Sequence, residues 1–294
     1  MRLLAAQSAS ASLSEAREAA MRAESRVVPL SSGEVHLIDE GRAGQFPAVI
    51  ILSAQWLAAT SFDAIAGELS NRTRVIRVDL PGHGLASPFA GEDYSGKGYA
   101  RVLGELLDDL AIDSFILVGQ SHSGIPATVI AAEAKRGLAG LVLATPSGLP
   151  RGGAAPPGTR ASGAETPRHR PLSFYRDKLA ALLKREHAPE RIERLAAEMK
   201  LFNELLGRDH ETTLRARQYD PRMLSAFLPR VRLPTLVLWS TDSTYLPPSM
   251  AGTVAGLLPQ CAGTEILPQT GHLLLADAPA DAAAHILAFM ERWT

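Results

Sequence analysis

One short segment carries residues whose types and order suit nucleophilic catalysis. Gly119-Gln120-Ser121-His122-Ser123-Gly124 follows the apolar run FILV and precedes an Ala-rich apolar stretch. This pattern is typical of a serine on a sharp strand-to-helix turn, where small flanking residues let the backbones approach and the hydroxyl is exposed. The N–H group of His122 would then point toward an oxyanion, and the helix start adds a favourable partial charge. A serine that caps a helix is the alternative interpretation.

A histidine near the end of the chain has the context of a general base. Gln269-Thr270-Gly271-His272 follows the last predicted strand and precedes the final helix. A serine hydroxyl is a weak nucleophile until a base accepts its proton, and neutral imidazole suits that role near neutral pH. We therefore expect His272 to meet Ser121. Five other histidines are expected at the surface or in packing: His36, His169, His187, His210 and His285.

The elements that must position these residues form an alternating pattern. Five short apolar runs predict strands buried on both faces of a parallel sheet: Ala48–Leu52, Arg74–Val78, Ser114–Val118, Leu141–Ala144 and Thr235–Trp239. One more strand is predicted at Thr264–Leu267. Helical patterns lie between and after the strands: Ser61–Leu69, Gly98–Leu110, Ile125–Ala134, Met250–Leu258 and Ala280–Trp293. An antiparallel hairpin of Arg26–Leu30 and Glu34–Asp39 precedes them. The pattern predicts an α/β fold with a doubly wound, mostly parallel sheet.

Two segments stand outside this alternation. Residues 1–25 are expected as a helical extension, with a helix from Ser12 to Glu24. The predicted core comprises residues 26–145 and 234–294, and residues 146–233 interrupt it. This insertion has a Pro- and Gly-rich loop followed by helical sequence, which predicts a helical lid. This insertion has 17 Arg and Lys against 10 Asp and Glu, a net charge of +7. The excess favours either an acidic substrate or a solvated helix face.

These residues resemble the α/β-hydrolase superfamily over roughly Arg26 to Thr294. Asp79-Leu80-Pro81-Gly82-His83-Gly84 is similar to the family's D-x-P-G-H-G loop, to which we assign a structural role, with His83 bracing the loop. The elbow departs from G-x-S-x-G, because Ser123 stands at the second glycine. The resemblance implies an α/β-hydrolase fold with a lid, Ser121 as nucleophile and His272 as base.

The third member of such a triad is ambiguous. The resemblance implies a carboxylate in the loop after Thr235–Trp239, where the sequence is LVLWSTDSTYLPP. Asp242 is the acid available there, and we expect it to orient His272. Matching the family's G-x-x-D-x-x-x-P without gaps instead puts Ser243 at the acid position. A turn aspartate with no catalytic role is the other interpretation of Asp242.

The oxyanion loop also departs from the family. Where members commonly carry His-Gly, this chain has Ser53-Ala54, and the backbone N–H of Gln55 is expected as the second oxyanion donor beside that of His122. Ala54 would tolerate positive φ poorly. Trp56 is a candidate for the pocket wall or for core packing. The further pocket candidates are Phe174, Tyr175, Phe202 and Tyr245.

Composition narrows the function classes. A net charge of −1 disfavours nucleic acid as a partner, and no apolar run has the length of a membrane helix. The single cysteine, Cys261, excludes an intrachain disulfide, and together with the absence of a signal-peptide pattern it favours the cytoplasm. There is no ligand-spaced histidine pair, CxxC or G-x-G-x-x-G, so no metal or other cofactor is expected. The sequence carries no signal for the oligomeric state.

The expected function is hydrolysis of a carboxylic ester, thioester or lactone of a small-molecule substrate through an acyl-enzyme on Ser121. The same Ser/His scaffold supports C–C bond hydrolysis, lyase chemistry and acyl transfer, and the fold does not choose among them. His122 directly after the serine also resembles cofactor-free dioxygenases of the superfamily. A non-catalytic binding protein is the remaining alternative, because the acid and oxyanion positions are unusual.

Overall fold

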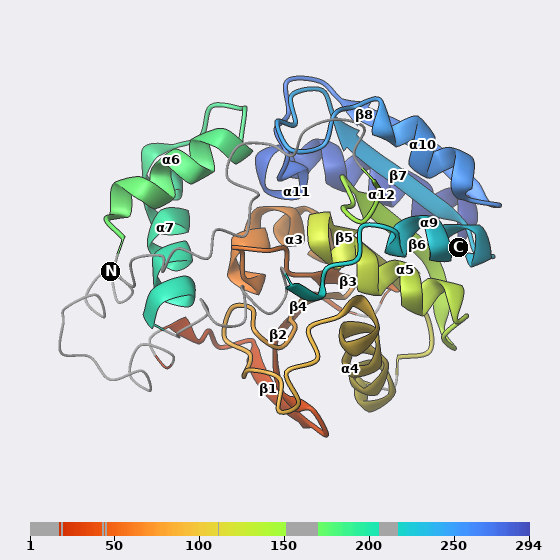
Figure 1. The fold of residues 1–294 in the computed structure, drawn as a ribbon, viewed down its shortest axis with the longest axis horizontal. Helices are drawn as coiled ribbons and strands as arrows, with labels where there is room; N and C mark the ends of the chain where they lie inside the picture. Colours follow the sequence, from red (N-terminus) through yellow and green to blue (C-terminus); the bar gives the residue numbers. More distant parts are fainter. Residues whose placement is uncertain are drawn as a thin grey trace.

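The computed structural model describes residues 18, 20–42, 44, 46–110, 112–150, 170–205 and 217–294. Residues 12–17 and 19 of the predicted N-terminal helix and most of the predicted Pro- and Gly-rich loop lie outside these residues, and residues 21–24, predicted as its last part, are not helical. Within them three strands come first, and strands and helices then alternate to the end of the chain, except for a run of helices between β6 (Leu138–Ala144) and β7 (Thr235–Ser240) (Figure 1).

The core is an eight-stranded sheet in the order β1-β2-β4-β3-β5-β6-β7-β8. The β1–β2 and β2–β4 pairs are antiparallel and the other pairs are parallel. This confirms the predicted α/β-hydrolase fold and its mostly parallel sheet. The strands are β1 (Ser25–Leu30), β2 (Gly33–Glu40), β3 (Ala48–Leu52), β4 (Val75–Asp79), β5 (Phe115–Gln120), β6 (Leu138–Ala144), β7 (Thr235–Ser240) and β8 (Cys261–Leu267).

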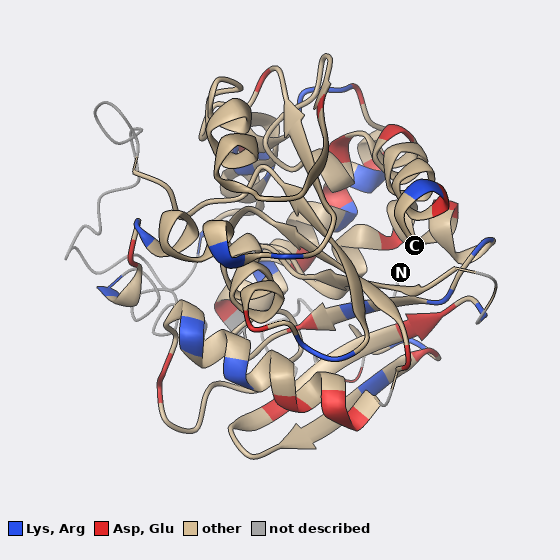
Figure 2. Cartoon of the chain, turned by 90° about the vertical axis from the view of Figure 1, so that its right-hand side faces the viewer, with Lys and Arg blue, Asp and Glu red and all other residues tan. Residues whose placement is uncertain are grey.

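The central strands are apolar because both of their faces are covered. β3, β5, β6 and β7 contain no charged residue, and Figure 2 shows the charged residues mainly on the helices, loops and outer strands around them. Side chains of β3 alternate between two core clusters: Ile50 and Leu52 join one, while Val49 and Ile51 join the other. The sheet therefore has helices on both sides, as a doubly wound arrangement requires.

The helices divide between these two clusters. Buried residues of α4, α5, α9 and α10 belong to the first cluster, and those of α3, α6, α7, α11 and α12 belong to the second. The helices outside the insertion are η1 (Ala59–Phe62), α3 (Asp63–Ser70), α4 (Gly96–Leu110), η2 (Ser121–Ser123), α5 (Gly124–Ala132), α10 (Met250–Leu257), α11 (Leu274–Asp277) and α12 (Pro279–Trp293).

In the described residues of the insertion between β6 and β7, every element of regular secondary structure is helical. Its elements are α6 (Leu172–Leu182), α7 (Pro189–Lys200), the π-helical turn η3 (Leu201–Leu205), α9 (Met223–Phe227) and η4 (Leu228–Arg230). Figure 1 shows α6 and α7 together at one side of the molecule. Tyr175 and Leu195 anchor them to the second cluster.

Candidate active site

The carboxyl ends of the parallel strands bring the predicted site residues to one edge of the sheet. The register pairs Leu52 of β3 with Gly119 of β5, so the loop after β3 starts beside the turn that carries Ser121. β7 and β8 run parallel to them and lead into the loops that carry Asp242 and His272. An open α/β sheet binds its ligands at this edge.

The turn at Ser121 has the strained geometry of a nucleophile elbow. Ser121 has φ 54°, a left-handed conformation that non-glycine residues rarely adopt. A Cβ at Gly119 would lie 2.8 Å from both Gly124 Cα and Ser123 O, so position 119 must be glycine for strand and helix to approach. This strain is maintained by the packing of β5 against α5.

Ser123 replaces the family's second glycine without opening this turn. Its side chain is buried, and its Oγ accepts the Gln120 N–H at 3.0 Å. The same hydroxyl lies 3.0 Å from Gln120 O and 3.3 Å from Leu52 O, either of which can accept its proton. The departure from G-x-S-x-G therefore adds a link between the elbow and β3.

His272 meets Ser121 across 151 positions of sequence. Its Nε2 lies 2.9 Å from Ser121 Oγ, within hydrogen-bond distance of the group it would deprotonate. The imidazole is 5% exposed. Tyr245, a predicted pocket residue, packs against it with the ring centroids 5.3 Å apart.

The backbone around His272 is held from two sides. Its carbonyl oxygen accepts hydrogen bonds from Thr145 Oγ1 at 2.9 Å and Gln120 Nε2 at 3.2 Å. The preceding N–H, of Gly271, donates to the buried carboxylate of Asp277 at 2.6 Å. Asp277 also accepts the backbone N–H groups of Lys184 and Arg185, which ties the base loop to the insertion.

Asp242 does not take the predicted place beside His272. Its carboxylate is exposed and accepts the Thr241 hydroxyl at 2.6 Å, while its own N–H donates to Thr270 O. Among the described residues, the Ser243 hydroxyl lies beside Nδ1 of His272, at 3.2 Å. The expectation for Asp242 is corrected accordingly: the loop keeps the ungapped register, and neighbouring residues in this turn point their side chains in different directions.

The loop after β3 forms a turn that presents Gln55. Leu57 N donates to Ala54 O at 3.0 Å, and the positive φ that this turn needs falls on Trp56, at 74°. Ala54 is fully buried and does not have positive φ. Ala54 therefore does not need the positive φ that alanine tolerates poorly. The oxyanion role of the Gln55 and His122 N–H groups remains a prediction.

Asp79 fastens this turn to the neighbouring loop. Its Oδ1 accepts Ser53 Oγ at 2.5 Å and Ala59 N at 2.8 Å, and its Oδ2 accepts Leu85 N at 3.2 Å. Nδ1 of His36 lies 2.8 Å from Oδ2. Burial alone would raise the pKa of Asp79, but the hydrogen bonds from His36, Ser53 and Leu85 outweigh it and lower the pKa.

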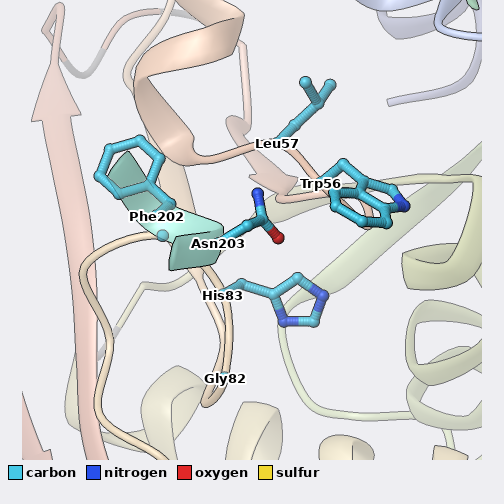
Figure 3. Close-up of a pocket in the computed structure, with 7 residues that line it drawn as sticks. Trp56, Leu57, Gly82, His83, Phe202 and Asn203 are labelled. Atoms are coloured by element: carbon cyan, nitrogen blue, oxygen red, sulfur yellow. The ribbon is translucent and has the colours of Figure 1, made fainter. Parts of the chain in front are cut away.

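A small pocket lies beside the Gln55 turn (Figure 3). Two predicted candidates, Trp56 and Phe202, line it, and the side chain of Asn203 points into the space between Trp56 and His83. The other lining residues are Leu57, Gly82 and Gly84. This pocket is where residues of the insertion approach the core loops.

Two further pocket candidates lie elsewhere. Tyr175 is fully buried in the second core cluster, and its hydroxyl donates to Glu204 at 2.9 Å. Burial and this carboxylate raise the pKa of the Tyr175 hydroxyl. Phe174 is 37% exposed and packs edge-on against Tyr175. Tyr175 is therefore a core residue and not a pocket wall, as its helical spacing also allowed.

Two cations of the insertion flank Trp56. Lys178 Nζ lies 4.3 Å and Arg170 Cζ 6.0 Å from the Trp56 ring. Burial, together with the neighbouring Arg170, lowers the pKa of Lys178. No carboxylate of the described residues pairs with Lys178. The indole face stabilises these charges by cation–π attraction.

Sequence reasoning missed several of these contributors. Lys178, Asn203 and Asp277 carry no motif, and only their packing identifies them. Ser243 did have a signal, since the ungapped match puts it at the acid position. Among the described residues, no group of three or more His, Cys, Asp or Glu side chains is arranged to hold a metal ion. None of the described helices has the length and apolar character to cross a bilayer.

Comparison with known proteins gives the family of this chain. Haloalkane dehalogenase 2 of Mycobacterium bovis is 30% identical over 120 residues, only 41% of this chain and 41% of that protein. The sn-1-specific diacylglycerol lipase ABHD11 of Mus musculus is 29% identical over 282 residues, which are 91% of this chain and 87% of that protein. A thermophilic esterase from Thermogutta terrifontis superposes with a TM-score of 0.73 at 23% identity, covering 92% of this chain and 100% of that one. The model of the alpha/beta hydrolase family matches residues 49–285, and the chain therefore belongs to that family.

Proposed function

We propose that this chain is a serine hydrolase that cleaves a carboxylic ester, thioester or lactone through an acyl-enzyme on Ser121. The single observation that carries the proposal is the 2.9 Å approach of His272 Nε2 to Ser121 Oγ on a strained turn. A hydroxyl held this way, beside a buried imidazole, is arranged for attack on a carbonyl carbon.

The reaction follows from this arrangement. Ser121 Oγ bonds to the carbonyl carbon as its proton moves to His272 Nε2, and the carbonyl electron pair moves to oxygen. The backbone N–H groups of His122 and Gln55 bind that oxyanion. Collapse breaks the bond to the leaving group, which takes the proton from His272. Water then releases the acyl group by the same steps in reverse.

The substrate is proposed to be a small molecule that carries an anionic group. Lys178 and Arg170 lie over Trp56, which follows Gln55 directly. A negative group bound there would sit close to the proposed oxyanion donors and would be attracted by two charges. The insertion then acts as a lid that selects the substrate, in line with its net charge of +7.

The experiment is a burst assay with activated esters under aerobic and anaerobic conditions. The proposal predicts one equivalent of leaving group released rapidly per active chain, followed by slower turnover, in both atmospheres. A requirement for oxygen would favour the dioxygenase chemistry. Turnover of a C–C bond substrate with no acyl-enzyme burst on any ester would favour the C–C hydrolase alternative.

A further inference from the structure

We propose that Asp277 is a positioning residue of the catalytic base, through which the connection between α6 and α7 of the insertion fixes the orientation of His272. This connection comprises residues 183–188. The inference rests on the proposed function in treating His272 as the base. It goes beyond that function because it assigns the insertion a role in aligning the base as well as in selecting the substrate.

The carboxylate of Asp277 binds N–H groups from two separate parts of the chain, and it is 1% exposed. Its Oδ2 accepts the N–H groups of Gly271 at 2.6 Å and Lys184 at 2.9 Å. Its Oδ1 accepts the N–H group of Arg185 at 3.0 Å and lies 2.7 Å from Nε2 of His187. A carboxylate only accepts, and these donors occupy both of its oxygens. One buried side chain therefore joins the base loop to the α6–α7 connection.

The side chain of His187 is held in the form that donates to Asp277. Its Nδ1 lies 2.6 Å from Nη1 of Arg191, and a guanidinium can only donate, so Nδ1 accepts. The proton of this neutral imidazole is therefore on Nε2, which faces the carboxylate. Arg191 also donates to the carbonyl oxygen of Ala276. The first turn of α7 thus binds both the imidazole and the backbone beside Asp277.

The residues on both sides of His272 depend on this connection and on the end of α6. The N–H group of Gly271 donates to the carboxylate just described, and that of Leu273 donates to Leu182 O at 3.2 Å. A Cβ at Gly271 would lie 2.9 Å from Leu183 C and would also overlap Leu182 O, so the two segments pack backbone against backbone. The imidazole extends from the Cα between these contacts. A displacement of the connection would therefore move Nε2 relative to the nucleophile.

The alignment of the base affects the rate of reaction more than it affects substrate binding. Asp277 is too deeply buried to touch a substrate, so its effect passes through the distance between His272 Nε2 and Ser121 Oγ. A displacement of reacting groups by about 1 Å can lower a rate by about 100-fold. We therefore expect a loss in kcat with little change in KM when the carboxylate is replaced.

The kinetic test is Asp277→Asn, which keeps the size of the side chain but replaces one acceptor oxygen by a donor. We expect kcat per active chain to fall by about 30-fold and KM to stay within about twofold, with active chains counted by burst amplitude. Asp281→Asn is the matched control, because it removes an exposed ion pair with Arg185 of the same connection and should change kcat by less than about twofold. An unchanged kcat per active chain in Asp277→Asn would overturn the proposal, since a purely structural role lowers only the number of folded chains.

A pair of variants at His187 keeps the test decisive if Asp277→Asn does not fold. His187→Leu removes one donor to the carboxylate and should lower kcat by about fivefold. His187→Gln keeps an N–H donor in the side chain and should stay within about twofold of the wild type. Equal values of kcat in the two variants would count against the proposal.

Amide hydrogen exchange follows the same hydrogen bonds without any substrate. In Asp277→Asn the N–H groups of Gly271, Lys184 and Arg185 should together exchange about tenfold faster than in the wild type. In Asp281→Asn they should exchange at the wild-type rate. Faster exchange of Lys184 and Arg185 with no change at Gly271 would show that the carboxylate does not hold the base loop, and would overturn the proposal.

The proposed function and this inference fail differently. If no ester is hydrolysed but a fluorophosphonate labels Ser121 more slowly in Asp277→Asn than in the wild type, Asp277 remains the positioning residue and the hydrolase function is rejected. If esters are hydrolysed at equal rates per active chain in both proteins, the function remains and the role of Asp277 is rejected.

Discussion

Two histidines in this molecule each lie between a serine and a second polar side chain. His36 has Ser25 Oγ 3.0 Å from Nε2 and Asp79 Oδ2 2.8 Å from Nδ1. His272 has Ser121 Oγ 2.9 Å from Nε2 and Ser243 Oγ 3.2 Å from Nδ1. A Ser-His-Asp composition thus occurs at His36, whereas the described side chain beside Nδ1 at the elbow is that of a serine.

The surroundings separate the two. The side chains of His36 and Asp79 are fully buried within paired strands of the sheet, with no approach for a substrate. Ser121 stands on a strained turn at the sheet edge, with φ 54°. Residue types alone therefore do not distinguish the two arrangements. The backbone conformation at the serine distinguishes them.

The largest expected effect is on kcat, and it distinguishes Ser121 from Ser25. Ser121→Ala and His272→Ala should each reduce kcat by about 10⁴–10⁶-fold, because each removes a group that acts in the bond-making step. Ser25→Ala should leave kcat within about twofold of wild type. Steady-state kinetics on one ester checks all three. Comparable losses in Ser25→Ala would mean that the His36 arrangement takes part in catalysis.

The next effect concerns stability at the His36 arrangement. Asp79→Asn should lower the free energy of unfolding by about 3–5 kcal/mol, because it leaves a buried network of four donors with a neutral partner. Urea denaturation measures the change. Asp242→Asn, in an exposed turn, is the control and should cost less than about 0.5 kcal/mol. Equal free energies of unfolding for Asp79→Asn and the wild type would show that the hydrogen bonds of Asp79 do not stabilise the fold.

Glu198 shows the opposite consequence of burying a carboxyl. Among the described residues it accepts Thr60 Oγ1 at 3.0 Å and lies 3.9 Å from the Arg22 guanidinium, and burial raises its pKa to about 7 from the ordinary 4.5. The folded state therefore binds this proton more tightly than the unfolded chain does. Its contribution is fully present below pH 4.5 and is lost as the pH rises through about 7.

Glu198→Gln should remove this dependence. Between about pH 5 and pH 8 the wild type should lose up to about 3 kcal/mol relative to the variant. Unfolding by urea at several pH values measures the difference. Parallel pH profiles for the two proteins would contradict the assignment of a proton to Glu198 in the folded state.

The smallest expected effect concerns substrate charge. Lys178→Met should raise KM for a succinate monoester by about fivefold, equivalent to about 1 kcal/mol, and leave a neutral ester unchanged. Lys184→Met removes an exposed charge from the same insertion away from Trp56, and should have no such effect. Equal KM changes in both variants would mean that the overall charge of the insertion, and not a site at Trp56, attracts the substrate.

Much of the framework is predictable because it rests on local patterns. The predicted strand Ala48–Leu52 matches β3, since a run buried on both faces is apolar at every position. The proximity of Ser121 and His272 was predictable because the elbow and the G-H loop impose residue types on a short stretch of chain. The mostly parallel sheet followed from the alternation of strands and helices.

The side-chain directions in the loops were not predictable to the same extent. Asp242 and Ser243 are adjacent, and hydrogen bonds of this loop, among them Asp242 N to Thr270 O and Leu246 N to Ser243 Oγ, accompany the placement of Ser243 beside His272. The positive φ of Trp56 depends likewise on the turn that starts at Ala54. The ungapped match to the family's loop gave a signal for Ser243, but the side-chain directions themselves depend on contacts between segments that lie apart in the chain.

Covalent labelling with a fluorophosphonate, mapped by peptide mass spectrometry, tests most directly whether the reactive serine is the one on the strained turn. The account predicts a single adduct on the peptide containing Ser121, lost in Ser121→Ala, strongly slowed in His272→Ala and unchanged in Ser25→Ala. An unlabelled wild-type protein, or an adduct that persists in Ser121→Ala, would contradict it.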